Sequence, residues 1–192
     1  MENTKHQHFA IYKPDGFLSQ FVNNEQRKNK KKLLGEFFDF PENIMAIGRL
    51  DEKSEGLLLL TTDGKTSELV RSKKIEKEYF VQVDGIISSK AIEMLKKGVE
   101  ITIETGNYTT IPCETFCLKE APTLPNRNKK IRDDRHGPTS WISIILTEGK
   151  FRQVRKMTAA VGYPTLRLVR VRIGQIHLEN MQPGEVKKVC NL

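Results

Sequence analysis

Long apolar runs and cysteine pairs are scarce in this 192-residue chain, and their scarcity excludes several classes of protein. No apolar run approaches the roughly 20 residues of a membrane-spanning helix. The N-terminus lacks the charged-then-apolar pattern of a secretion signal. The three cysteines include no Cys-x-x-Cys pair, which argues against a disulfide scaffold or a zinc site. We therefore predict a cytoplasmic protein that crosses no membrane and binds no metal.

Acidic residues are outnumbered, and one long stretch has none. The chain carries 32 Lys and Arg against 24 Asp and Glu, a formal net charge of +8, which favours a polyanionic partner such as nucleic acid. The stretch 150–172 contains no acid, and its cations are Lys150, Arg152, Arg155, Lys156, Arg167, Arg170 and Arg172. A face kept only for solubility would normally mix the two signs. We therefore interpret this stretch as a surface for phosphate contacts.

Periodicity and turn residues predict an α+β fold with a largely antiparallel, mixed sheet. Strands are expected at 9–12, 44–50, 57–62, 77–85, 141–149 and 164–178, with one or two more within 107–118. Helices are expected at 66–71, 88–97 and 151–162, the second with a serine cap and the third ended by a glycine.

The cations of the basic stretch have expected directions within these elements. On the helix, Arg152, Arg155 and Lys156 are spaced to share one face. On the following strand, Arg170 and Arg172 point to one side and form a cationic row, while the alternate valines and isoleucine point to the other.

The bend between two of the strands is unusual, because Arg49 and Asp51 lie there with one leucine between them. Chains that turn between strands mostly use Asn-Gly or Asp-Gly. If the first strand continues through this point, the two side chains share a face; if the chain bends, they diverge.

Four stretches carry a family resemblance. The bend itself, "GRLDEKSEGLLLLTTDG", resembles the motif of the catalytic aspartate in bacterial pseudouridine synthases of the RsuA/RluA superfamily. Three others resemble further motifs of that family in the same order: "YKPDGFLSQF", "KEYFVQV" and "ILTEGKFRQVRKMTAAVGYPTLRLVRVRIGQI". The likeness is greatest to the branch that lacks an N-terminal S4-type RNA-binding domain and modifies one uridine of large-subunit ribosomal RNA. It implies one catalytic domain over 1–192, with two halves around a central RNA-binding cleft, no S4 domain and a monomeric state.

The resemblance also implies the chemistry, which is the isomerisation of uridine to pseudouridine without a metal or cofactor. Asp51 is expected to act as nucleophile or base, with Arg155 as its cationic partner. Arg49 is the rival partner by proximity, although contact with the RNA backbone suits it better. Tyr79 is expected to stack on the base or move a proton. The other residues expected to bind ribosomal RNA are Lys13, Lys150, Arg152, Lys156, Arg167 and Arg170.

Two other functions stay open at this point. A non-catalytic RNA-binding or ribosome-assembly protein could use the same scaffold, although such a protein would be expected to have lost Asp51, Tyr79 or Arg155. A hydrolase that cleaves the glycosidic bond would instead release uracil. The loop 119–139 is long for a compact domain and mixes charges, so RNA contact there is also open.

Overall fold

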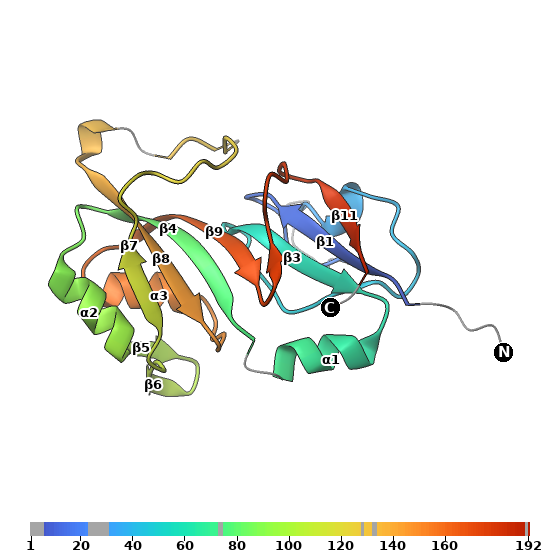
Figure 1. Ribbon diagram of the computed structural model, residues 1–192, viewed down its shortest axis with the longest axis horizontal. Helices are drawn as coiled ribbons and strands as arrows, with labels where there is room; N and C mark the ends of the chain where they lie inside the picture. The colour runs from blue at the N-terminus through green and yellow to red at the C-terminus, as the bar shows by residue number, and fades with distance from the viewer. Residues whose placement is uncertain (1–5, 23–30, 73–74, 128, 132–133, 191) are drawn as a thin grey trace.

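A computed structural model describes residues 6–22, 31–72, 75–127, 129–131, 134–190 and 192. Its main sheet has the order β11-β1-β3-β9-β4-β8-β7 (Figure 1), with β2 paired to β3 and β10 to β9. These strands are β1 (His8–Lys13), β2 (Met45–Ala46), β3 (Glu55–Thr61), β4 (Lys77–Asp84), β7 (Glu114–Cys117), β8 (Thr139–Leu146), β9 (Thr165–Ile173), β10 (Ile176–His177) and β11 (Val186–Val189). A separate hairpin consists of β5 (Glu100–Ile103) and β6 (Gly106–Thr109).

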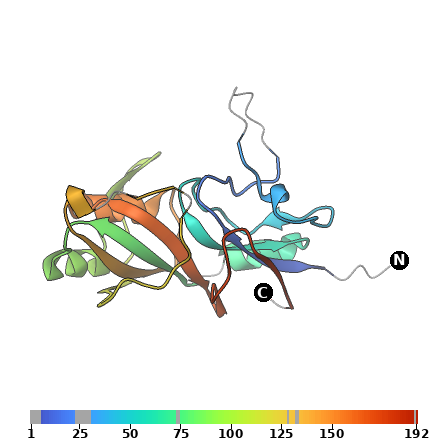
Figure 2. The same cartoon turned by 90° about the horizontal axis from the view of Figure 1, so that it is seen from above.

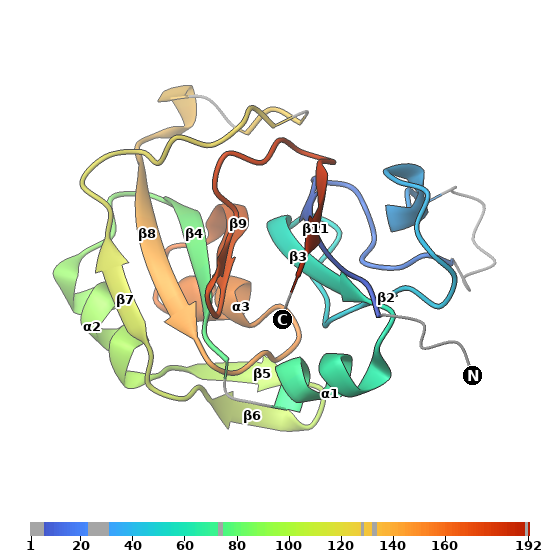
Figure 3. The ribbon, with the colours of Figure 1, turned by 45° about the vertical axis from the view of Figure 1, so that its right-hand side comes forward.

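The sheet has two sides that meet where β3 pairs with β9. That pairing is parallel, whereas every other neighbouring pair of the main sheet is antiparallel. β1, β2, β3 and β11 form one side, and β4, β7, β8 and β9 form the other (Figures 1 and 3). Seen from above, the two sides stand next to each other along the long axis of the molecule (Figure 2). Residues at the β3–β9 junction therefore face groups from both sides.

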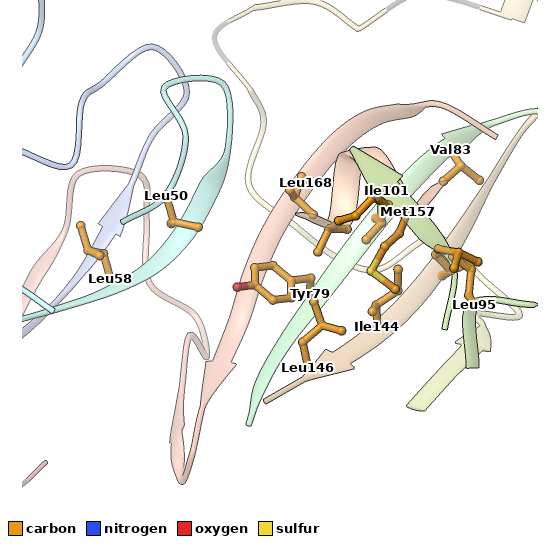
Figure 4. Close-up of a cluster of buried hydrophobic side chains, with 14 of the residues drawn as sticks. Leu50, Leu58, Tyr79, Val83, Leu95, Ile101, Ile144, Leu146, Met157 and Leu168 are labelled. Atoms are coloured by element: carbon orange, nitrogen blue, oxygen red, sulfur yellow. The ribbon is translucent and has the colours of Figure 1, made fainter. Parts of the chain in front are cut away.

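Three α-helices pack on this sheet: α1 (Gly64–Ser72), α2 (Ser89–Lys97) and α3 (Gln153–Ala160). Two short 3₁₀ turns, η1 (Leu34–Glu36) and η2 (Asp134–His136), lie in connections. Helix α2 begins after Ser88, whose hydroxyl accepts a hydrogen bond from the amide of Ala91, as the sequence predicts for a serine cap. Apolar side chains of α2 and α3 pack on β4 and β8 in the larger hydrophobic cluster (Figure 4). This packing gives β4 a rigid backing on the side that carries Tyr79.

The predicted fold class is confirmed, while two expected elements are wrong in extent. The strand expected at 44–50 is reduced to β2: Ile47 N still donates to Leu59 O of β3, but further along the chain Leu50 N donates to the Ser19 hydroxyl instead of a strand. The strand expected at 164–178 instead turns back after Ile173 and forms a β9–β10 hairpin. Within the described ranges, no helix has the length and apolar character to cross a membrane.

The junction of the two sides requires a glycine at position 56. Gly56 lies opposite Arg170 in the parallel register and has a φ of +103°. A Cβ atom there would lie 2.3 Å from the Arg170 carbonyl oxygen and 2.7 Å from its nitrogen. Since both atoms belong to backbone in a central strand, neither can move aside cheaply.

We predict that Gly56→Ala lowers the free energy of unfolding by at least about 3 kcal/mol, because it adds backbone strain and a clash at the junction. Denaturant titration followed by circular dichroism measures the change. Gly64→Ala is the matched control, because its φ is not positive and a Cβ there meets no atom within 4 Å. Equal stability of the two variants would contradict this account of the junction.

Candidate active site

The bend over residues 47–54 is a rigid loop that presents Asp51. The Ser19 hydroxyl donates to the Leu50 carbonyl at 2.9 Å and accepts from the Leu50 amide at 3.0 Å. The amide of Ser54 donates to the Asp51 carbonyl at 3.0 Å. Leu50 is buried, while the Asp51 side chain is 22% exposed. The bend thus anchors a leucine and leaves the next residue, a carboxylate, open to a ligand.

Lys13 lies beneath this bend and is completely buried. Its Nζ donates to the carbonyls of Pro14 and Phe17, both at 2.8 Å, and approaches that of Glu52 at 3.4 Å. Burial lowers the pKa of Lys13 to about 8, against the opposing effect of nearby carboxylates. The expected contact of Lys13 with RNA is therefore wrong, because its buried ammonium group connects the turn after β1 to the bend over residues 47–54.

Arg155 reaches Asp51 from the other side of the sheet. Its Nε lies 3.8 Å from Asp51 Oδ2, and its Nη2 donates to Lys53 O at 2.8 Å and to Ser54 Oγ at 3.3 Å. Burial lowers the pKa of Arg155, and the Asp51 charge acts against that shift. Arg49 is instead exposed, and within the described ranges it makes no hydrogen bond or ion pair. Of the two candidate partners of Asp51, the structure therefore brings Arg155 to the carboxylate.

Tyr79 completes the group from strand β4. It is 9% exposed, and its ring belongs to the hydrophobic cluster (Figure 4). In that view its hydroxyl points out of the cluster toward the side that carries Leu50. A small pocket is lined by Arg49, Asp51, Tyr79, Glu148, Lys150 and Arg152, among others. With Leu168 of β9, side chains from four separate stretches of sequence thus converge on one pocket.

The loop between β8 and α3 forms the remaining wall and is held by a buried amide. Gln153 Oε1 accepts from the Lys150 amide at 2.9 Å, and its Nε2 donates to Glu148 Oε1 at 2.6 Å. The second Glu148 oxygen accepts from the Tyr108 hydroxyl at 2.5 Å, which raises the pKa of that tyrosine. Arg152 precedes α3 with a φ of 54°, a strained conformation typical of functional sites. This loop leaves Lys150 and Arg152 exposed at the pocket, and their binding of RNA stays a prediction.

The exposed cationic row expected on β9 is wrong, because Arg170 and Arg172 both bond within the protein, while RNA contact by Arg170 stays a prediction. Arg167 is 8% exposed and pairs with Glu55 at 2.9 Å, so its expected RNA contact is also wrong. Arg170 is 4% exposed, and its Nε donates to Leu57 O at 2.7 Å. Arg172 pairs with Glu76 and Glu78, each at 3.0 Å.

Helix α3 begins at Gln153, so the expected helical face of three cations also divides. Arg152 lies before the helix, and Arg155 turns to Asp51. Lys156 is half-buried; its Nζ donates to Thr102 O at 2.7 Å and lies 5.3 Å above the Phe151 ring. RNA binding by Lys156 stays a prediction.

Sequence reasoning missed Arg127, which connects the loop 119–139 to the other side of the sheet. Its guanidinium pairs with Asp15 and, at 3.2 Å, with Glu55. The available signal was Glu55, a carboxylate in a strand otherwise filled by apolar residues, because a buried acid needs a cationic partner. This part of the loop is therefore docked beside the site.

Comparisons with known proteins show which family this chain resembles. The family model for RNA pseudouridylate synthase matches residues 7–160. The chain is 41% identical to ribosomal large subunit pseudouridine synthase E of Vibrio parahaemolyticus over 92% of this chain and 71% of that protein. It is 42% identical to the protein of the same name from Xanthomonas campestris over 91% of both chains. A crystal structure of a pseudouridylate synthase superposes with a TM-score of 0.73 at 26% identity, covering 97% of this chain and 71% of the other.

We predict that Lys13→Met destabilises the protein by about 2–3 kcal/mol near neutral pH, because it leaves buried carbonyl oxygens without a donor. The stability that Lys13→Met loses relative to the native protein should grow between pH 8 and 10.5. In that window the unfolded native sequence still holds the Lys13 proton while the folded protein has released it, so native stability rises with pH by up to about 3 kcal/mol relative to the variant.

Urea titrations at pH 7 and pH 10 measure both effects, with Lys97→Met as the control at an exposed lysine. The burial of a protonated Lys13 would be contradicted if the native protein and Lys13→Met differed less in free energy of unfolding at pH 10 than at pH 7.

Proposed function

The chain belongs to the RNA pseudouridylate synthase family, and from this premise we propose that it isomerises a specific uridine of large-subunit ribosomal RNA, with Asp51 as the catalytic carboxylate. One observation carries the assignment of Asp51. Its carboxylate is partly exposed in a pocket, next to the Arg155 guanidinium at 3.8 Å and beside Tyr79. The large-subunit substrate is proposed from the names of the relatives.

The reaction rearranges one glycosidic bond and requires no net gain or loss of atoms. The bond from ribose C1′ to base N1 breaks, the base turns while it is held, and C5 bonds to C1′; C5 then loses its hydrogen as a proton and N1 takes up a proton. One ionised carboxylate beside the ribose can act as nucleophile or as base. Asp51 suits either role, because the bend leaves its side chain open while the backbone is fixed by Ser19 and Lys13.

Arg155 has the role of a positioning cation. Its Nη2 is anchored to the Lys53 carbonyl and the Ser54 hydroxyl, so its Nε approaches Asp51 from a fixed direction. A nearby cation favours the ionised form of a carboxylate. Arg155 would therefore hold Asp51 charged and oriented when substrate displaces water from the pocket.

Tyr79 and the exposed cations serve the substrate. The target uridine must leave its stack to reach Asp51, which costs a few kcal/mol that phosphate contacts can offset. Arg49, Lys150 and Arg152 are exposed around the pocket and can supply such contacts. The Tyr79 ring, which lines the same pocket as Asp51, would stack on the extruded base, and its hydroxyl would bond the base or transfer a proton.

We expect Asp51→Asn to fold and bind RNA but to lose activity by at least about 1000-fold, because the amide can act neither as base nor as a competent nucleophile. Tritium release from ribosomal RNA labelled at uridine C5 measures turnover, since C5 loses its hydrogen only when it becomes the glycosidic carbon. Glu52→Gln, which removes the neighbouring carboxylate paired with Lys31, is the matched control.

Three results would change the proposal. Native turnover by Asp51→Asn would remove Asp51 from the mechanism. Free uracil among the products would indicate a hydrolase, and RNA binding without product by the native protein would favour a non-catalytic ribosome-assembly role.

A second prediction separates the two roles of Tyr79. Tyr79→Phe keeps the ring, so RNA affinity should be retained while turnover falls by about 100-fold through loss of the hydroxyl. Tyr79→Leu should lose affinity as well, because it also removes the stacking surface. Native turnover by Tyr79→Phe would restrict this residue to stacking.

A further inference from the structure

A second pocket of about 310 Å³ adjoins the pocket at Asp51, and Arg49, Tyr79, Glu148 and Gly149 line both. Its apolar walls come from the bend, β3, α1 and β9: Ile47, Leu59, Val70 and Ile173. Its cationic walls are Arg49, Arg71, Lys77 and Arg170. The proposed reaction assigns no occupant to this space.

Arg170 contributes a buried donor that lacks an acceptor. The residue is 4% exposed, and its Nε is used by the Leu57 carbonyl. Its Nη2 is shielded from solvent and has no hydrogen-bond partner among the residues that the structure describes. A buried guanidinium nitrogen without an acceptor is costly, and an anion nearby in the pocket would lower that cost through its charge.

Lys77 adds a second cation with spare donors. Its Nζ donates once, to Ile75 O at 2.9 Å, and an ammonium group has three hydrogens to donate. Burial lowers the pKa of Lys77, and the charge of Arg170 lowers it further. The two cations therefore repel each other across the pocket.

The acid on the pocket wall does not compensate them. Glu148 accepts hydrogen bonds from Tyr108, Ile111 and Gln153, which occupy both of its oxygens. Among the described lining residues, four cations thus face one carboxylate that is already bonded. The apolar walls keep the space from being a general solvated basic surface.

We propose that this pocket binds a phosphodiester group of the RNA strand adjacent to the uridine at Asp51. A phosphate oxygen would accept one of the spare Lys77 Nζ hydrogens, and its charge would relieve the repulsion between Lys77 and Arg170. Because the two pockets share Arg49 and Tyr79, one strand can occupy both. The assignment rests on the proposed function only in taking RNA as the ligand.

The test compares native protein with Lys77→Met in two binding measurements that do not use turnover. The first is the shift in Tm caused by inorganic phosphate, which should be present in the native protein and absent or much smaller in Lys77→Met. The second is affinity for a short single-stranded oligouridylate, which should fall about tenfold, with the slope of log K against log salt reduced by about 0.7.

Two further variants control for net charge and for folding. Lys90→Met also removes one positive charge, at an exposed position on α2 outside the pocket, and should match the native protein in both measurements. Arg71→Met removes an exposed cation of the same pocket from α1 and should lower oligouridylate affinity in the same direction as Lys77→Met.

The Tm without any anion separates binding from a structural role. If Lys77 is poised for an anion, Lys77→Met relieves repulsion with Arg170 and its Tm is equal to or above that of the native protein. A clear drop in Tm together with native oligouridylate affinity would overturn the proposal and make Lys77 a structural residue.

The remaining outcomes separate the sources of phosphate. If inorganic phosphate raises the Tm of the native protein while Lys77→Met and Arg71→Met bind oligouridylate with native affinity, the RNA assignment is overturned and the pocket is a site for free anions. If Lys90→Met also loses the phosphate-induced Tm shift and the oligouridylate affinity, both depend on net charge alone, and the proposed phosphate pocket is overturned. A failed proposed function would instead appear as turnover by Asp51→Asn, which none of these measurements involves.

Discussion

The short parallel pairing of β3 with β9 is the constraint on which the site depends. Asp51 comes from the bend that precedes β3, whereas Tyr79 and Arg155 come from β4 and α3 on the other side. These groups meet only because Gly56 lets the two strands approach without a side chain between them. Next to Gly56, the buried carboxylate of Glu55 pairs with Arg167 from β9 and Arg127 from the loop 119–139. Steric fit and ion pairing thus hold the same junction.

The cations near the site are of two kinds, buried ones that bond within the protein and exposed ones around the pocket. Lys13 and Arg167 are buried and bonded to carbonyl or carboxylate oxygens, so they hold the bend and the junction. Arg49, Lys150 and Arg152 stay exposed around the pocket at Asp51. A strongly basic chain can therefore hold the Asp51 carboxylate among several cations. The buried cations are bonded within the protein, whereas the exposed cations can bind a polyanion.

Arg170 and Lys77 belong to neither group, since they are largely withdrawn from the surface yet have donors to spare. Cations in this state destabilise the free protein slightly and gain most from an anionic ligand, because binding supplies the missing charge and acceptors together. They line a pocket that shares Arg49 and Tyr79 with the pocket at Asp51. Binding energy from a flanking phosphate could then offset the cost of extruding the uridine.

The sequence by itself determined the α+β class, most strands and helices, the serine cap of α2 and the family, because alternation, capping and contiguous motifs are local properties. It also drew attention to Asp51, Tyr79 and Arg155, although it could not bring them together. Tertiary structure alone decided which cation meets Asp51, because Arg49 and Arg155 are equally basic and only the crossing of the sheet brings Arg155 Nε to 3.8 Å. It also decided that Lys13 and Arg167 are buried while Lys150 and Arg152 are not. Charge can be read from a residue type, but its solvation depends on partners distant in the chain, such as Glu52 for Lys13 and Glu55 for Arg167.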